Sequence, residues 1–135
     1  MFSAETQVRV RYGETDQMGY CYYGNYAQFF EIGRVEALRS LGMNYRKMEE
    51  DGIMLPVLDY KVKYIKPALY DDLLTIRTII PEIPKARIRF EYEIYNERNE
   101  LLSKAETTLV FIGKENMKPR SAPEDFIEKL EGLKK

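Results

Sequence analysis

The residues best suited to carry chemistry lie in one loop, which runs from Gly13 to Gly24 and contains Asp16. Three glycines punctuate the loop, and a long segment of helical periodicity follows it. Glycine lets backbone amides approach a ligand, and the first amides of a helix carry partial positive charge. A carboxylate beside such amides can accept a proton while the amides polarise an oxygen of the ligand. The loop is therefore a candidate site, and a turn or cap role for Asp16 is the structural alternative.

The composition narrows the chemistry that this loop can perform. The 135-residue chain has no histidine and one cysteine, Cys21. Catalytic triads built on histidine are excluded, and no zinc or transition-metal site is expected, because the usual imidazole and thiolate ligands are missing. Nothing basic stands beside Cys21, which favours simple packing of its thiol over a nucleophilic role. A carboxylate is the remaining candidate for a general base.

The charge balance and the termini restrict partners and location. Lys and Arg total 21 against 22 Asp and Glu, so no global field recruits nucleic acid or an anionic membrane. The N-terminus lacks the basic and apolar regions of a signal peptide, and no apolar run approaches the ~18 residues of a membrane span. We expect a cytoplasmic protein that forms a single domain over residues 1–135.

Hydrophobic periodicity predicts the elements that position the loop. Alternation over Val8–Tyr12 indicates a strand, and an apolar stripe over Asn25–Leu41 indicates a long helix that leaves Arg34 outside. A short helical turn, four further strands and a terminal helix follow at residues 44–52, 55–65, 73–80, 85–95, 101–112 and 122 onward. One long helix and about five strands predict an α+β fold with an antiparallel sheet around the helix.

This order and its motifs resemble the hotdog-fold thioesterases of the 4-hydroxybenzoyl-CoA thioesterase and YbgC-like type. The resemblance runs from Val8 to about Leu130. Its residues are Arg11-Tyr12, Glu14-Thr15-Asp16 and Gly19, then Asn25-Tyr26 with Phe29-Phe30-Glu31 and Arg34, then Lys66-Pro67-Ala68 with Asp71-Asp72. The resemblance implies a hotdog fold.

The resemblance also implies an activity and its residues. Asp16 would attack the thioester carbonyl or activate a water, and the backbone amides of Tyr23 and Gly24 would polarise the carbonyl oxygen. The residues expected to line the substrate pocket are Met18, Gly19 and Tyr26. An acyl-CoA thioester is the implied substrate, with no separate cofactor. Many YbgC-like members carry histidine at the position of Tyr23, a difference that is harmless if only the backbone amide acts.

The coenzyme A phosphates call for basic side chains. Lys118, Arg120 and Lys66 are the candidates, with ordinary solvated charge as the alternative. The family further implies a homodimer or homotetramer with sites at the interface.

Other interpretations stay open at this point. The same hydrolysis on an acyl carrier protein would turn the basic residues into a docking patch, and a non-catalytic acyl-CoA-binding hotdog protein would bind without releasing thiol. A hotdog dehydratase is disfavoured, because that chemistry usually draws on histidine. Glu31 occupies the helix, where another hotdog lineage places its carboxylate, but an ion pair with Arg34 is the simpler role.

Overall fold

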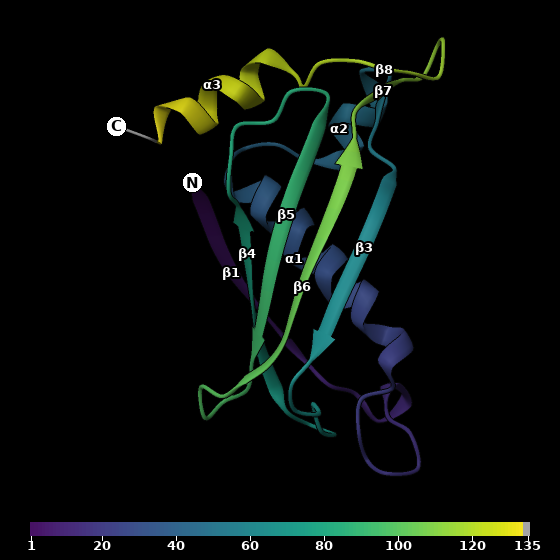
Figure 1. The fold of residues 1–135 in the computed structure, drawn as a ribbon, viewed down its shortest axis with the longest axis vertical. Helices are drawn as coiled ribbons and strands as arrows, with labels where there is room; N and C mark the ends of the chain where they lie inside the picture. The colour runs from purple at the N-terminus through teal and green to yellow at the C-terminus, as the bar shows by residue number, and fades with distance from the viewer. Residues whose placement is uncertain (134–135) are drawn as a thin grey trace.

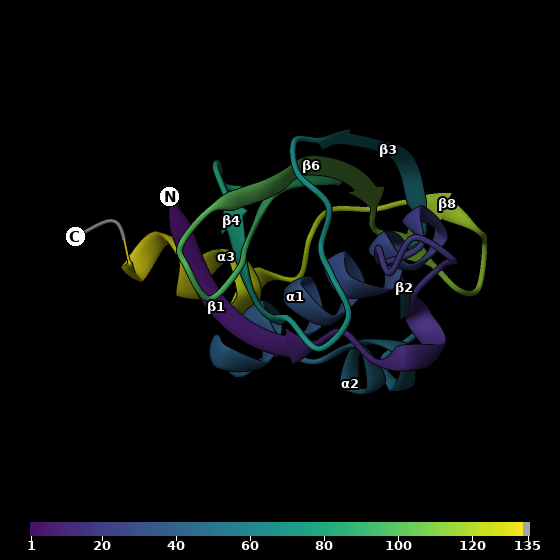
Figure 2. The ribbon, with the colours of Figure 1, turned by 90° about the horizontal axis from the view of Figure 1, so that it is seen from below.

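A five-stranded antiparallel sheet curves around one long helix in the computed structural model, which describes residues 1–133 (Figures 1 and 2). The strand order is β1-β4-β5-β6-β3. The strands are β1 Phe2–Arg9, β3 Val57–Tyr64, β4 Leu73–Ile80, β5 Arg87–Tyr95 and β6 Leu101–Val110. The predicted α+β hotdog arrangement is confirmed.

The central helix α1 (Tyr26–Ser40) packs its apolar stripe against the inner face of the sheet. Phe29 and Phe30 are almost completely buried. Gly33 faces the sheet so closely that an added Cβ would lie 2.5 Å from Thr78 Oγ1. A larger residue at this position would push the helix away from the sheet, so glycine permits the close helix–sheet contact.

Short elements complete the chain. They are the 3-10 turns η1 (Tyr12–Glu14) and η2 (Tyr23–Asn25), helices α2 (Tyr45–Glu50) and α3 (Glu124–Gly132), and a small sheet of β2 (Ile53–Met54), β7 (Ile112–Gly113) and β8 (Lys118–Pro119). The small sheet lies at the end of the molecule opposite the start of α1 (Figure 1). Within residues 1–133, no helix combines the length and apolarity that a membrane crossing requires.

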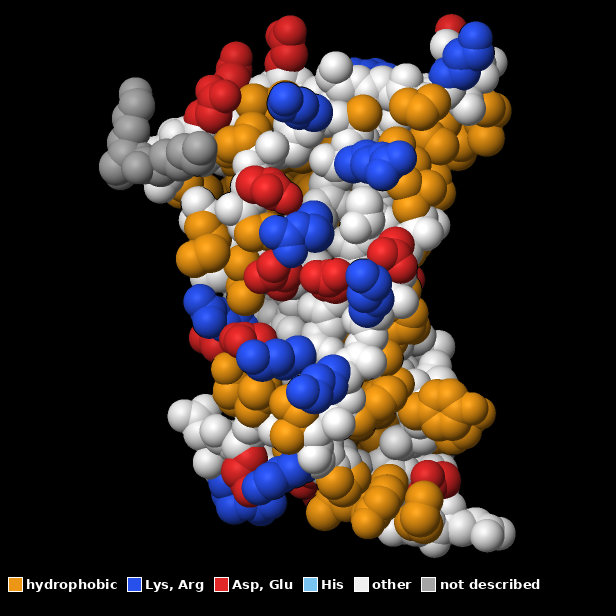
Figure 3. All heavy atoms as spheres, in the orientation of Figure 1, with side chains coloured by type: hydrophobic (Ala, Val, Ile, Leu, Met, Phe, Trp, Pro, Cys, Tyr) orange, Lys and Arg blue, Asp and Glu red, His pale blue; other side chains and the backbone are white. Residues whose placement is uncertain are grey.

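The outer face of the sheet is charged. Arg77 pairs with Glu93 across β4 and β5, and Lys61 pairs with Glu106 across β3 and β6. Figure 3 shows basic and acidic side chains alternating across this face. The alternation along each strand therefore separates an apolar inner face from a solvated outer face.

The first strand differs from its prediction. We expected Val8–Tyr12, but β1 starts at Phe2 and pairs with β4 in a register that matches Phe2 with Ile80. Tyr12 leaves the sheet in η1 and is 78% exposed. Residues 2–7 alternate only weakly between apolar and polar side chains, so the sequence pattern does not reveal this part of the strand. The long pairing of β1 with the apolar strand β4 stabilises it.

Arg34 also contradicts its prediction, because its side chain is buried instead of facing solvent. Nε donates to Tyr45 Oη at 3.1 Å and Nη1 to Tyr92 Oη at 3.5 Å. The expected ion pair with Glu31 is not formed. Hydroxyl groups from α2 and β5 accept from this buried guanidinium, and helical periodicity alone cannot reveal such partners.

Candidate active site

The Asp16 loop is closed by its own hydrogen bonds. The N–H of Asp16 donates to Tyr20 O at 2.8 Å, and the N–H groups of Met18 and Tyr20 donate to Asp16 Oδ1 at 2.9 and 3.2 Å. Asp16 therefore does perform the turn role. Over residues 1–133, however, no hydrogen bond reaches its second oxygen, Oδ2. One oxygen fixes the carboxylate, and the other is available for chemistry.

Gly19 supplies the backbone conformation that this turn needs, with φ at +77°. We expect Gly19→Ala to lower the free energy of unfolding by ~1–2 kcal/mol, since an L-residue is strained in this region. No atom lies within 4 Å of an added Cβ, so backbone strain is the only cost. Gly13→Ala is the control, because Gly13 has equal space and no left-handed φ. Equal denaturation midpoints for the two variants would contradict this assignment.

Residues 66–72 anchor the loop from outside. The N–H of Cys21 donates to Ala68 O at 2.7 Å, and the N–H of Tyr70 donates to Gly19 O at 3.1 Å. An isolated β-bridge joins Tyr20 to Leu69. These contacts fix the Asp16 loop on a neighbouring segment of the main chain.

Two amides at the start of the helix are free. The N–H of Tyr22 donates to Glu14 O and that of Asn25 to Tyr22 O, and the Asn25 side chain donates to Glu14 O at 2.8 Å. For the N–H groups of Tyr23 and Gly24, by contrast, residues 1–133 provide no acceptor. They are the first residues of η2, which leads directly into α1, so the positive end of the helix lies here.

A pocket of about 300 Å³ opens beside these groups. Its lining consists of Asp16, Met18, Tyr20, Cys21, Tyr23, Tyr26, Tyr64, Ile65, Lys66 and Pro67. The structure thus brings five of the predicted residues to one pocket, and these are Asp16, Met18, Tyr23, Tyr26 and Lys66. Gly19 instead shapes the turn behind the pocket, and Gly24 is not part of its lining. Tyr64, Ile65 and Pro67 were not predicted to lie here. The Lys66-Pro67 motif was the sequence signal that could have indicated this part of the pocket, because these residues reach the pocket from the end of β3.

Burial makes Cys21 unsuitable as a nucleophile. It raises the pKa of the thiol to about 11, with the charge of Glu14 acting in the same direction. The thiol is therefore protonated at neutral pH, and Cys21 is 6% exposed. The predicted packing role is confirmed.

Tyr26 forms part of the apolar floor of the pocket. Burial raises the pKa of its hydroxyl to about 12, against the opposing effect of a hydrogen bond from the Ala68 N–H. Its ring lies edge-on to that of Tyr64, with 5.0 Å between centroids.

Lys118 lies in β8 and Arg120 directly follows this strand, at the end of the molecule opposite the Asp16 pocket. They border a separate polar hollow of about 430 Å³ with Lys114 and Asn116. Of the three predicted coenzyme contacts, Lys66 thus lines the Asp16 pocket, and Lys118 and Arg120 do not. Across residues 1–133, no three or more His, Cys, Asp or Glu side chains are grouped so as to hold a metal ion.

A curved antiparallel sheet wrapped around one long helix is the architecture of the hotdog fold. The chain belongs to the thioesterase-like superfamily, whose family profile matches residues 10–130. It is a thioester hydrolase by this membership and by its relatives.

Several relatives are similar over nearly the whole chain. YneP of Bacillus subtilis is 36% identical over the full length of both proteins. The acyl-CoA thioester hydrolase YbgC of Escherichia coli is 33% identical over 89% of this chain and 90% of its own. The crystal structure of DHNA-CoA thioesterase from Staphylococcus aureus superposes with a TM-score of 0.92 at 34% identity, covering 99% of this chain and 92% of that one.

Proposed function

We propose that this protein hydrolyses an acyl-CoA thioester to a carboxylate and free coenzyme A. One observation carries the proposal. The free Oδ2 of Asp16 and the free amides of Tyr23 and Gly24 lie at one loop–helix junction, and Asp16 and Tyr23 line one pocket. The YbgC and DHNA-CoA thioesterase relatives support a CoA ester as the substrate.

The amides stabilise the charge that develops on the thioester oxygen. A water adds to the carbonyl carbon while Asp16 Oδ2 takes its proton, and collapse of the tetrahedral oxyanion expels the CoA thiolate, which takes up a proton. Alternatively, Oδ2 attacks the carbonyl and expels the thiolate, and water then hydrolyses the resulting anhydride. Both routes consume one water, and both need the Asp16 carboxylate and the free backbone amides.

The lining of the pocket favours a small acyl group. Four tyrosines and Met18 contribute to the wall, and a volume of about 300 Å³ suits a short or aromatic acyl group better than a long chain. Thiol release from short, aryl and long acyl-CoA esters tests this preference. The highest kcat/KM should fall on a short or aryl ester, and a preference for long chains would contradict the assignment.

The edge strand β3 supports assembly into a homodimer or larger homo-oligomer. Among residues 1–133 it has a pairing partner on one side only, and four of its five apolar residues are 40–52% exposed; these are Val57, Leu58 and Tyr60, with Tyr64 at its end. An unpaired apolar edge of this length needs a cover. Antiparallel pairing of two β3 strands would cover it and bring the β8 end of one subunit toward the pocket of the other.

That arrangement would let Lys118 and Arg120 contact the coenzyme phosphates in the partner subunit's pocket. We expect Lys118→Ala/Arg120→Ala to raise KM for a CoA ester roughly 5- to 10-fold at low salt with little change in kcat. The corresponding pantetheine ester, which lacks the nucleotide, should show no change. Arg87→Ala/Lys104→Ala on the outer face of the sheet is the control. If the Lys118→Ala/Arg120→Ala variant had an unchanged KM for the CoA ester, Lys118 and Arg120 would not be coenzyme contacts.

A further inference from the structure

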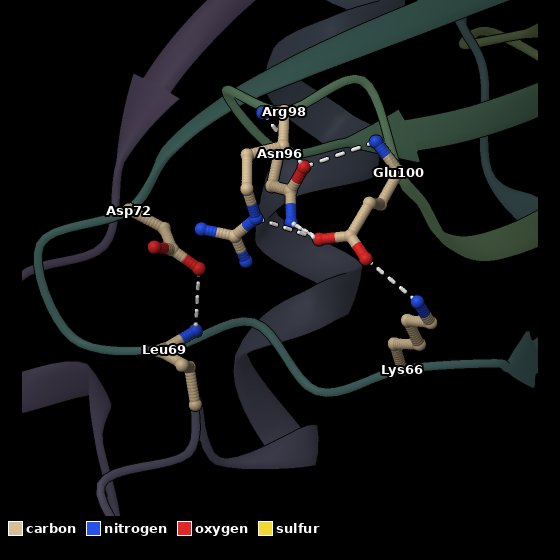
Figure 4. A network of polar contacts seen from close by, with 6 residues as sticks. All are labelled: Lys66, Leu69, Asp72, Asn96, Arg98 and Glu100. Carbon is tan, nitrogen blue, oxygen red and sulfur yellow. Dashed lines mark hydrogen bonds and ion pairs between the residues drawn. The ribbon is translucent and has the colours of Figure 1, made fainter.

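A polar network joins the hairpin between β5 and β6 to the segment that anchors the Asp16 loop (Figure 4). Glu100 Oε2 accepts from Lys66 Nζ at 2.6 Å, while Oε1 accepts from Asn96 Nδ2 at 2.8 Å and from Arg98 Nε at 3.0 Å. Asn96 is buried, and its Oδ1 accepts from the N–H groups of Arg98 and Glu100. The hairpin therefore fixes Oε1 of Glu100 through Asn96 and Arg98, which leaves Oε2 directed at Lys66.

The hairpin holds residues 66–73 at two points. Lys66 is the first, and the second is the N–H of Leu73, which donates to Glu97 Oε1 at 3.0 Å. Between them, Asp72 Oδ2 accepts from the N–H of Leu69 at 2.9 Å and closes the segment on itself. Of the two ends, only Lys66 also lines the Asp16 pocket.

The same segment then holds the catalytic loop. Ala68 O and the Tyr70 N–H bond to the main chain of Cys21 and Gly19, on either side of Tyr20. A continuous path of hydrogen bonds and main chain thus runs from Glu100 through Lys66 to the loop that carries Asp16.

We propose that Glu100 is a positioning residue for thioester hydrolysis, which acts through Lys66 to hold the Asp16 loop in its reactive geometry. The inference rests on the proposed function. The side chains of Lys66 and Glu100 are 55% and 32% exposed, and ion pairs with such exposure add little to global stability. The role of this pair is therefore local. The hydrogen bond from Lys66, with those from Asn96 and Arg98, lowers the pKa of Glu100 to about 2, so the carboxylate stays charged in any hydrolysis assay near neutral pH.

The test compares Glu100→Gln, Lys66→Met and the double variant with the wild type. We expect each single variant to lower kcat roughly 5- to 20-fold, because small displacements of reacting groups are costly. For Glu100→Gln, KM should stay within about twofold, whereas Lys66→Met should also raise KM because Lys66 lines the pocket. The double variant should lose no more kcat than the single variants. Amide hydrogen exchange at Cys21 and Tyr70 should become faster in all three.

Glu93→Gln is the matched control. Glu93 accepts from Arg77 Nη1 at 3.3 Å and Tyr95 Oη at 3.0 Å, but it lies on the outer face of the sheet. The kcat of Glu93→Gln should equal that of the wild type. The Tm values of Glu100→Gln and Glu93→Gln should agree within about 2 °C.

Three results would overturn the proposal. The first is a kcat for Glu100→Gln equal to that of Glu93→Gln. The second is a change in KM with an unchanged kcat, which would make Lys66 a substrate contact only. The third is unchanged amide exchange at Cys21. A wild type that hydrolyses no thioester would instead refute the proposed function. In that case the exchange measurement alone still decides whether Glu100 holds the loop.

Discussion

Asp16→Asn should lower kcat for acyl-CoA hydrolysis by about 10²- to 10⁴-fold, the range expected when a positioned general base is removed. An amide neither takes the proton of the attacking water nor attacks the carbonyl efficiently. The side-chain oxygen of asparagine can still accept from the N–H groups of Met18 and Tyr20, so the loop should keep its shape. KM should therefore change little, and thiol release under saturating substrate measures the effect.

Asp125→Asn is the control for this substitution. Asp125 lies in the first turn of α3 and lines neither the Asp16 pocket nor the hollow beside Lys118. The rate of this variant should match that of the wild type. If Asp16→Asn hydrolysed at the same rate as Asp125→Asn while both were folded, neither route through Asp16 would stand.

Tyr23→Pro should lower kcat by about 10²- to 10³-fold, as expected for loss of one oxyanion donor. Proline removes the N–H of residue 23 but suits the first position of a helical turn. The preceding residue, Tyr22, already has the extended conformation that proline requires, with φ −61° and ψ 132°. The variant thus removes a hydrogen-bond donor with little change to the backbone.

The side chain of Tyr23 requires a separate test. Tyr23→Ala keeps the amide and loses the ring, which is 67% exposed. Its kcat should stay within a few-fold of the wild type if the backbone alone acts. Equal losses in Tyr23→Pro and Tyr23→Ala would assign the effect to the ring and contradict the oxyanion role of the amide.

The elements with strong periodicity could be predicted from the sequence. The helix at Asn25–Leu41 is found as α1 at Tyr26–Ser40, and the strand at 73–80 is found as β4 with the same limits. Both carry apolar residues at regular spacing that one packed face requires. The loop motif around Asp16 could also be recognised, because its glycines and the start of the helix lie close together in the sequence.

Contacts between distant segments could not be predicted. The pocket wall formed by Tyr64 and Ile65, and the ion pair of Lys66 with Glu100, join residues that only the sheet topology brings together. The burial of Arg34 depends on hydroxyl groups from two other elements. No local pattern encodes such partners, since helical periodicity reports one face of one element.

Release of thiol and free acid from a panel of short, aryl and long acyl-CoA esters tests the central claim most directly. The wild-type protein can be used with a thiol reagent, because Cys21 is buried and its pKa is raised to about 11. We predict saturable release of thiol and acid in equal amounts from at least one short or aryl ester, with the activity lost in Asp16→Asn. Folded wild-type protein that releases no thiol from any of these esters would contradict the account.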